Sequence, residues 1–298
     1  ALEALCDPSI SLPAYARVID QKTGKEVKYD PFAITERLQA TIVSYYSDPP
    51  LTDLGQTKWL TLLGYRQGGK SLTAEACGYV KSAYTPGHDH VCIADNKDRA
   101  EYLHRRIHLI HNNWPKVVRA KTVPNREVRR LSFAHGGKLR VLSGESGAVG
   151  IGQSPDSFHG SELPYWRNAG HQFSMIYPSM INRDHSKVLL ESTPAPMTEM
   201  STEWWRDQCR DAKQGLGRWT YAFFPFWDGK LNQRRWPKNS ALTNEEIGMM
   251  SRYGPEGLKK EHLAFRRLML ETDAEIRRNP DLFKVYYPFD DVSCWIAT

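Results

Sequence analysis

The sequence is poor in cysteine and has no long hydrophobic run. Its five cysteines form no C-x-x-C pair, which argues against a disulfide framework and against a cysteine zinc site. No apolar stretch is long enough to cross a bilayer, and no charged and then apolar leader opens the chain. We therefore expect a protein of a reducing compartment that does not interact with membranes.

A strong excess of one charge is also missing. Lysine and arginine total 40 against 34 aspartates and glutamates, which gives a net charge of +6 and a pI near 9.0. This modest excess suits a polyanionic partner but does not by itself indicate DNA binding. With 298 residues, 40% of them hydrophobic, the chain can bury one large core with a smaller region attached.

Residues 64–71 contain a complete phosphate-binding loop of the form G-x-x-x-x-G-K-S. In such a loop, glycines let backbone N–H groups surround phosphate oxygens, the lysine reaches the β and γ oxygens, and the serine hydroxyl holds Mg²⁺. An apolar run at 59–63 precedes the loop and a helical pattern at 70–84 follows it, as a nucleotide site requires. We assign nucleotide binding to Gly64, Gln67, Gly68, Gly69, Lys70 and Ser71.

Strand and helix patterns alternate after the loop. We expect strands at 91–94, 188–190 and 219–224, a helix at 98–112, and a hairpin formed by 129–133 and 138–143. A further helix is expected at 33–47. The alternation predicts an α/β fold with a mainly parallel sheet flanked by helices.

The pattern changes near residue 230, where loop-like sequence leads into helices expected at 244–252 and 255–271. We therefore divide the chain into an ATPase core with an N-terminal arm, residues 1–229, and a small helical lid or linker subdomain, residues 230–298.

Hydrolysis also requires an acid near Mg²⁺ and a group that positions water. Glu162 is the best candidate for the second role, although a glutamate before Leu-Pro is also an ordinary surface residue. Ser161 stands where an aspartate usually supports the metal. We expect Ser161, together with Ser71, to support Mg²⁺ indirectly.

Four motifs in a fixed order resemble the large terminase subunits of tailed bacteriophages, which are DNA-packaging motors. They are the loop at 64–71, Gly150-Ile151-Gly152-Gln153, His159-Gly160-Ser161-Glu162 with the aromatic stretch to Trp166, and Leu190-Glu191-Ser192-Thr193-Pro194. The resemblance extends over residues 30–298 and includes Phe224 to Trp227 and Tyr286 to Asp291. It implies a P-loop NTPase of the additional-strand, catalytic-glutamate type.

The resemblance also implies roles for single residues. Glu162 would be the catalytic carboxylate, Ser192 and Thr193 would form the motif that couples hydrolysis to DNA movement, and Gln39 would contact adenine. The family often has arginine where this chain has Ile151. Arg66 in the loop, which we include among the catalytic candidates, or Arg140 in the hairpin would then supply the positive charge.

ATP and Mg²⁺ are the cofactors that the resemblance implies. The implied partners are double-stranded DNA, a portal protein and a small terminase subunit, with copies of the chain acting as a ring in the cytoplasm of an infected bacterial host. The chain ends where a nuclease domain would begin, so we expect no endonuclease activity. A helicase-like translocase and a nucleotide-gated scaffold that binds ATP without turnover remain alternatives.

Three other patterns receive a structural interpretation. His104, His108 and His111 share a helix face, but no glutamate accompanies them as in H-E-x-x-H, so we expect a solvated face rather than zinc. Trp204 and Trp205 are expected to pack, whereas Arg234 and Arg235 are better candidates for contact with nucleic acid. Asp290 and Asp291, adjacent in an extended segment, are not expected to form a metal site.

Overall fold

The computed structural model describes residues 2–19, 24–29, 37–124, 127–146, 154–181 and 185–296. Within these ranges, a seven-stranded sheet has the order β5-β6-β4-β7-β8-β3-β9. Every neighbouring pair is parallel except β5 and β6, which form the predicted hairpin. The strands are β3 (Trp59–Gly64), β4 (Asp89–Ala94), β5 (Arg130–Ser132), β6 (Lys138–Ser143), β7 (Ser157–Ser161), β8 (Lys187–Ser192) and β9 (Trp219–Phe224).

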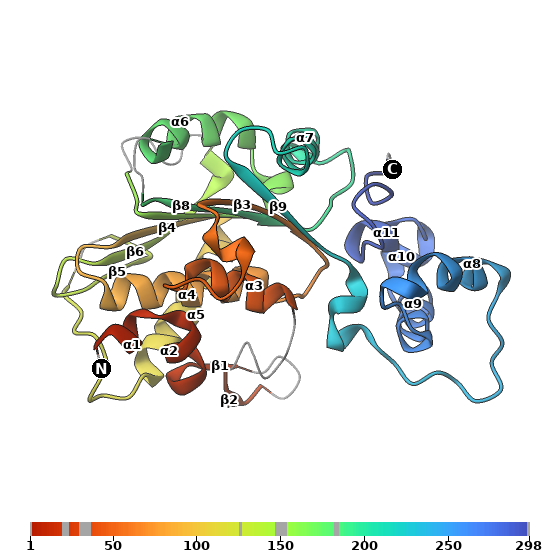
Figure 1. Cartoon of the computed structure of the whole chain (residues 1–298), viewed down its shortest axis with the longest axis horizontal. Helices are drawn as coiled ribbons and strands as arrows, with labels where there is room; N and C mark the ends of the chain where they lie inside the picture. Colours follow the sequence, from red (N-terminus) through yellow and green to blue (C-terminus); the bar gives the residue numbers. More distant parts are fainter. Residues whose placement is uncertain are drawn as a thin grey trace.

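Helices cover both faces of the sheet (Figure 1). One face carries α3 (Arg37–Tyr46), α4 (Lys70–Tyr84) and α5 (Lys97–Asn113), and the other carries α6 (Ala169–Ile181) and α7 (Thr202–Lys213). The fold class predicted from the sequence, an α/β fold with a mainly parallel sheet between helices, is therefore confirmed.

Strand side chains alternate between two buried clusters. On β3, Leu60 and Leu62 join the cluster that contains α4, whereas Trp59 and Leu63 join the cluster that contains α6 and α7. The alternation arises because successive strand residues point to opposite faces. Burial on both faces explains why the strands of this parallel sheet appear in the sequence as short, almost continuous apolar runs.

The N-terminal arm packs on the same face as α4 and α5. It consists of α1 (Leu2–Cys6), α2 (Pro8–Tyr15) and a ribbon in which β1 (Arg17–Ile19) pairs with β2 (Glu26–Lys28). After the ribbon, the hydroxyl groups of Tyr29 and Thr73 lie 2.6 Å apart, which ties the arm to α4.

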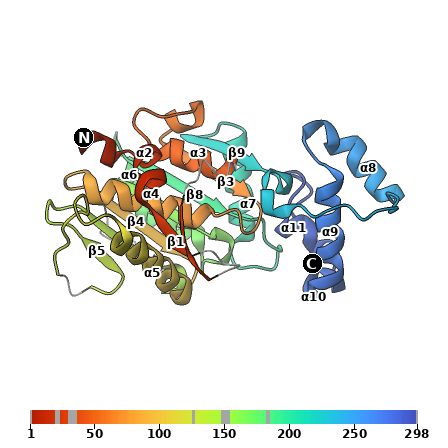
Figure 2. The ribbon, with the colours of Figure 1, turned by 90° about the horizontal axis from the view of Figure 1, so that it is seen from below.

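A helical region lies beyond the β9 edge of the sheet (Figures 1 and 2). It contains α8 (Asn244–Tyr253), α9 (Lys260–Thr272), α10 (Ala274–Arg278) and α11 (Leu282–Tyr286). Short 3-10 turns occur in this region and elsewhere, at Asp53–Gln56, Gly144–Ser146, Leu163–Tyr165, Phe226–Asp228, Lys230–Asn232 and Gly254–Glu256.

The helix expected at 255–271 begins later, at Lys260. Gly254–Glu256 form a 3-10 turn, and Gly257 follows with a φ of +119°, a conformation that interrupts helical geometry and favours glycine. At the chain end, Asp291 pairs with Lys213 of α7 at 2.8 Å, and Trp295 packs against the α6 and α7 cluster. The boundary between 229 and 230 stays a prediction.

All five cysteines are free thiols, as expected. Among the described residues, no helix combines the length and the apolar character needed to cross a bilayer.

Candidate active site at the carboxyl end of the sheet

The phosphate-binding loop connects β3 to α4, as predicted. Because α4 begins at Lys70, the unpaired N–H groups of a helix of 15 residues lie at the loop, and their dipoles favour an anion there. Gln67 and Gly69 both have a positive φ, of 61° and 73°. The left-handed backbone of Gly69 favours glycine, and a Cβ there would also lie 2.3 Å from Nε2 of the Gln39 side chain.

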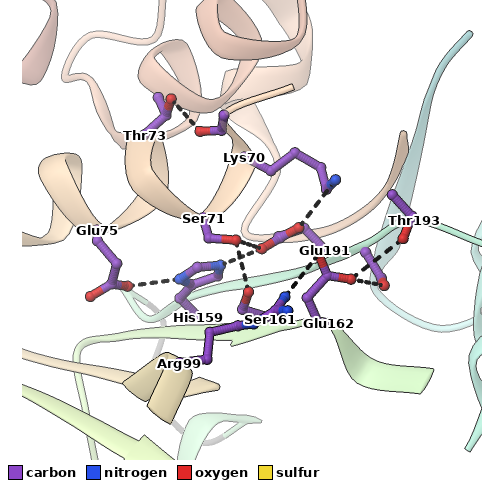
Figure 3. A network of polar contacts seen from close by, with 12 residues as sticks. Lys70, Ser71, Thr73, Glu75, Arg99, His159, Ser161, Glu162, Glu191 and Thr193 are labelled. Atoms are coloured by element: carbon purple, nitrogen blue, oxygen red, sulfur yellow. Dashed lines mark hydrogen bonds and ion pairs between the residues drawn. The ribbon is translucent and has the colours of Figure 1, made fainter. Parts of the chain in front are cut away.

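Lys70 and Ser71 both contact Glu191, a residue to which the sequence analysis assigned no role. The buried Lys70 Nζ donates to the carbonyl oxygen of Tyr65 at 3.0 Å and lies 3.9 Å from Glu191 Oε2. Ser71 Oγ donates to Glu191 Oε1 at 2.8 Å and lies 2.9 Å from Ser161 Oγ (Figure 3). The predicted phosphate and metal residues therefore converge on one buried carboxylate.

The sheet topology brings the other predicted residues to the same place. β7, β8 and β3 are neighbours and run parallel, so their carboxyl ends meet at one edge. Glu162 follows β7, Ser192 ends β8, and the phosphate-binding loop follows β3. Three segments that lie far apart in the sequence thus form one site.

The Glu162 carboxylate is held by the two residues of the predicted coupling motif. Its Oε2 accepts hydrogen bonds from Ser192 Oγ at 2.9 Å and from Thr193 Oγ1 at 3.5 Å. The backbone of Glu162 has a left-handed conformation with φ 58°, and its N–H donates to the carbonyl oxygen of Glu191 at 2.9 Å. A left-handed conformation is uncommon for glutamate, and such strain is concentrated at functional sites.

Arg99 is a site residue that the sequence analysis missed. It lies in the first turn of α5, and its guanidinium nitrogen is 3.6 Å from Glu162 Oε1. A second contact, at 3.1 Å, joins it to Asp95, just after β4. The sequence contains a usable signal, because Asp95 and Arg99 follow a predicted strand whose carboxyl end lies at the same edge as those of β3 and β7.

A buried network of alternating charge lies beneath the phosphate-binding loop (Figure 3). His159 Nε2 lies 3.2 Å from Glu191 Oε1, and His159 Nδ1 lies 2.7 Å from Glu75 Oε1. His90 Nε2 continues the network at 3.3 Å from Glu75. The three charged groups around His159, namely Glu75, Glu191 and Lys70, are almost completely inaccessible to solvent.

Hydrogen bonding keeps this network ionised despite its burial. Burial alone would lower the pKa of His159, but its hydrogen bonds to Glu191 and Glu75, and their charges, raise that pKa to about 9. Burial would raise the pKa values of the two carboxyls, yet that of Glu191 falls to about 2 because of His159 and Lys70, and that of Glu75 falls to about 2 because of His90 and His159. The negative charges of Glu75 and Glu191 are therefore balanced by the positive charges of His159 and Lys70.

Gln39 and Arg66, two candidates from the sequence, lie at the phosphate-binding loop and contact protein groups there. Gln39 is buried in α3 with its amide nitrogen against Gly69, and its Oε1 has no hydrogen-bond partner among the described residues. The guanidinium of Arg66 lies 3.7 Å from the ring centre of Tyr286, and the Arg66 N–H donates to the Tyr286 carbonyl oxygen at 2.9 Å. Contact between Gln39 and adenine, and a catalytic role for Arg66, stay predictions.

Arg140 was considered as a source of positive charge because Ile151 stands where the family often has arginine. Arg140 forms a 2.7 Å ion pair with Asp89, the first residue of β4, and so it lies toward the end of the sheet opposite the phosphate-binding loop. This contact removes Arg140 from the candidates for the site. The departure at Ile151, with the glycine-rich run around it, lies outside the described residues.

The histidine face on α5 differs from the expectation. His111 is buried and its Nδ1 lies 3.2 Å from the Tyr79 hydroxyl, while the rings of His104 and His108 are 4.5 Å apart and partly covered. Burial lowers the pKa values of all three, to about 4 for His104 and His111. The expected solvated face was therefore wrong for His111.

The tryptophan pattern agrees with its structural interpretation. Trp205 is fully buried and Trp204 packs against Phe173, as expected. Asp290 contacts Tyr253, whereas Asp291 contacts Lys213, so the two acids have separate partners.

A cavity of about 960 Å³ lies elsewhere, between the N-terminal arm and the amino ends of β4, β7 and β8. Asp7, Lys81, His88 and Lys187 are among the residues that line it. We place the active site at the phosphate-binding loop because the motif, Glu162, Glu191 and the carboxyl ends of the strands coincide there, whereas the cavity is lined neither by the loop nor by these two carboxylates.

Comparison with known proteins identifies the fold. No protein-family model matches the sequence, and no curated protein matches it. Among solved structures, the large terminase ATPase domain of Thermus phage P74-26 is similar to 92% of this chain and 99% of its own chain, with a TM-score of 0.54 and 15% identity. The bacteriophage HK97 large terminase matches 97% of this chain with a TM-score of 0.62 and 14% identity.

The chain spans about half, 55%, of the length of the HK97 protein. At these identities the comparison establishes the architecture. The chain has the fold of the ATPase domains of phage large terminases, which are P-loop NTPase-like, as the order of its sequence motifs predicted.

Proposed function

We propose that this chain is an ATPase that drives double-stranded DNA into a viral procapsid, the role implied by the terminase ATPase fold. One observation carries the proposal. The carboxyl ends of β3, β7 and β8 bring the phosphate-binding loop, the Glu162 carboxylate and the Ser192-Thr193 pair to one edge of the sheet. The loop offers a phosphate cradle and, in Ser71, a metal ligand, and Glu162 is the group that would orient water, which are the parts that phosphoryl transfer requires.

The residues present fit a magnesium nucleotide. The first turn of α4 offers N–H donors and the positive end of a helix dipole to phosphate oxygens, with Lys70 beside them. The Ser71 hydroxyl next to a buried carboxylate matches the oxygen ligands that Mg²⁺ prefers. When bound, Mg²⁺ neutralises charge on the phosphates as a Lewis acid.

Each residue then has a defined task. Lys70 binds the γ-phosphate, Ser71 binds the metal, and Glu162 orients and polarises the attacking water. Ser192 and Thr193 hold the Glu162 carboxylate and so link its position to the end of β8. Arg99 restrains the other oxygen of that carboxylate.

The charge of the chain and the fold support the proposed partners. A net charge of +6 favours double-stranded DNA as a partner. The large terminase fold suggests a portal protein and a small terminase subunit as further partners, with several copies of the chain forming a ring in the cytoplasm of an infected bacterial cell.

The test is ATP turnover with and without duplex DNA, for the wild type, Glu162→Gln and Lys70→Ala, with nucleotide binding measured in parallel. We expect Glu162→Gln to lower turnover by about 10²- to 10⁴-fold while nucleotide binding is retained, because only water activation is lost. Lys70→Ala should weaken both. Unchanged turnover in Glu162→Gln would show that another acid acts.

A strand-separation assay and the same turnover and binding measurements separate the alternatives. Strand separation on a forked duplex would favour a helicase-like translocase. Tight ATP binding without turnover, even with DNA, would favour the nucleotide-gated scaffold.

A further inference from the structure

The acidic motif at the end of β7 is one carboxylate short. Phosphate-loop NTPases use one acid to support the metal and a group that orients the attacking water. Here Ser161 occupies the first position and Glu162 the second. A serine hydroxyl carries no charge, so position 161 cannot supply the missing carboxylate.

Glu191 lies beside that position on the neighbouring strand. In the parallel register of β7 and β8, Ser161 and Glu191 are direct partners. Side chains of partnered residues point to the same face of a sheet, and this face is the one covered by α4. Glutamate is one methylene longer than aspartate, and the Glu191 carboxylate reaches Ser71 Oγ at 2.8 Å, close to Ser161 Oγ, which lies 2.9 Å from the same atom.

The Glu191 carboxylate is only half satisfied within the described part of the protein. Its Oε1 contacts Ser71 and His159, but its Oε2 is buried and has no hydrogen-bond partner, with Lys70 Nζ 3.9 Å away. Leaving a buried charged oxygen without a hydrogen bond is costly. A metal ion at Ser71, with its water shell, would provide that partner.

His159 fixes the orientation of this carboxylate. Its Nε2 binds Glu191 Oε1 and its Nδ1 binds Glu75 Oε1, at 3.2 Å and 2.7 Å. A histidine held between two buried carboxylates resembles the outer-shell partners that orient ligands around metal sites. Glu75 lies on the far side of His159, one turn after Ser71 in α4, and among the described residues its side chain forms no hydrogen bond or ion pair with Lys70 or Ser71.

We propose that Glu191 supplies, from β8, the metal-site carboxylate that the acidic motif lacks at Ser161. It is a positioning residue that acts through the Ser71 hydroxyl and the water around the metal of a bound magnesium nucleotide. The proposal rests on the ATPase function proposed above. It places the acid that supports the metal on β8, at the residue that pairs with Ser161 of β7.

The experiment measures metal binding rather than turnover. Mn²⁺ binding in the presence of ADP is followed by electron paramagnetic resonance for the wild type and Glu191→Gln, and ADP affinity is measured in EDTA. Glu191→Gln keeps the size of the side chain and removes its charge. We expect Mn²⁺ affinity to fall by about 10- to 100-fold, as for other outer-shell changes, while ADP affinity in EDTA is not weakened.

Two further variants separate a metal role from a structural one. Ser161→Asp combined with Glu191→Gln returns the carboxylate to β7 and should restore Mn²⁺ affinity to within a few-fold of the wild type. Glu75→Gln, which disturbs the same histidine from the other side, should lower Mn²⁺ affinity much less than Glu191→Gln does. If Glu191→Gln alone does not fold, the double variant still provides the test, because it keeps the charge at the site.

Wild-type Mn²⁺ affinity in Glu191→Gln, an equal loss in Glu75→Gln, or no recovery in the double variant would overturn the proposal. These outcomes are distinct from a failure of the proposed function. If the wild type binds ADP neither with Mn²⁺ nor in EDTA, the ATPase assignment itself is wrong. If the wild type binds ADP in a metal-dependent manner and Glu191→Gln does the same, only the role of Glu191 is wrong.

Discussion

Two interiors of this molecule are built in opposite ways. Beneath the phosphate-binding loop, the interior contains the buried charges of Glu75, His159 and Glu191. Beneath the C-terminal helices, it contains aromatic rings, among them Phe226, Phe283 and Phe289, whose ring centres lie 5.0 to 6.0 Å apart. The first interior is held by charge balance and the second by packing.

This difference predicts different responses to substitution. A buried charge that loses its partner remains uncompensated, so each such substitution lowers the free energy of unfolding by a large amount. An aromatic ring that is trimmed loses contacts in proportion to the volume removed, so the cost is graded. The proposed metal and phosphate chemistry requires fixed charges, which the first kind of interior provides, and the helical region has no such requirement.

Removing the histidine should give the largest effect on stability. His159→Leu leaves Glu75 and Glu191 without the positive charge between them, and we expect the free energy of unfolding to fall by about 3–5 kcal/mol or more. Urea denaturation followed by circular dichroism measures the change. Combining His159→Leu with Glu75→Gln should recover part of the loss, since one unpaired charge is gone. A loss below about 1 kcal/mol would contradict the charge-balance account.

Trimming the aromatic interior should cost less per change and in graded steps. Phe283 is buried among Phe226, Phe289 and Tyr287. We expect Phe283→Ala to lower the free energy of unfolding by about 3 kcal/mol and Phe283→Leu by about half as much. The same denaturation assay applies. Equal costs for the two variants would show that the ring is not held by packing volume.

Stability should also depend on pH through His159. Its pKa is about 9 in the folded protein, above the ordinary histidine value, so its contribution is complete below about pH 6.5 and is lost as the pH rises toward 9. We expect unfolding free energy to fall by up to about 2 kcal/mol between pH 6.5 and 8. Denaturation midpoints at several pH values measure this decline.

His88 provides a matched control for the pH experiment. Burial lowers its pKa to about 4, so it is neutral over the whole interval. His88→Gln should therefore leave the decline in place and change it by less than about 0.5 kcal/mol, since His88 titrates only in the unfolded chain over this interval. A stability that is constant between pH 6.5 and 8 in the wild type would show that His159 is not charged in the native state.

The smallest stability effect is expected at the rim of the site. The Arg99 side chain is 45% exposed and its pair with Glu162 is 3.6 Å long, so Arg99→Gln should change stability by less than about 1 kcal/mol. Turnover should fall by about 3- to 10-fold, because Glu162 loses one restraint. Arg105→Gln, on the same helix and also exposed, is the control. Equal turnover in the two variants would remove Arg99 from the site.

Local pattern predicted much of the fold. Both α4, at 70–84, and β9, at 219–224, have the bounds expected from the sequence, because each is set by its own apolar spacing and by neighbouring glycine or proline. The helix expected from 255 was predicted too early, since the left-handed Gly257 interrupts it. The burial of His111 was also missed, because its contact with Tyr79 joins α5 to α4 through two residues that are 32 positions apart in the sequence.

By itself, the sequence determined the phosphate-binding loop, the mainly parallel arrangement of the sheet and the choice of Glu162 as the candidate catalytic acid. These depend on spacing within short segments. Only the tertiary structure decided that Glu191 stands beside Ser161, that His159 lies between two carboxylates and that Arg99 reaches Glu162. These depend on the register of neighbouring strands and on how α4 and α5 pack on them, and long-range packing of the whole core sets both.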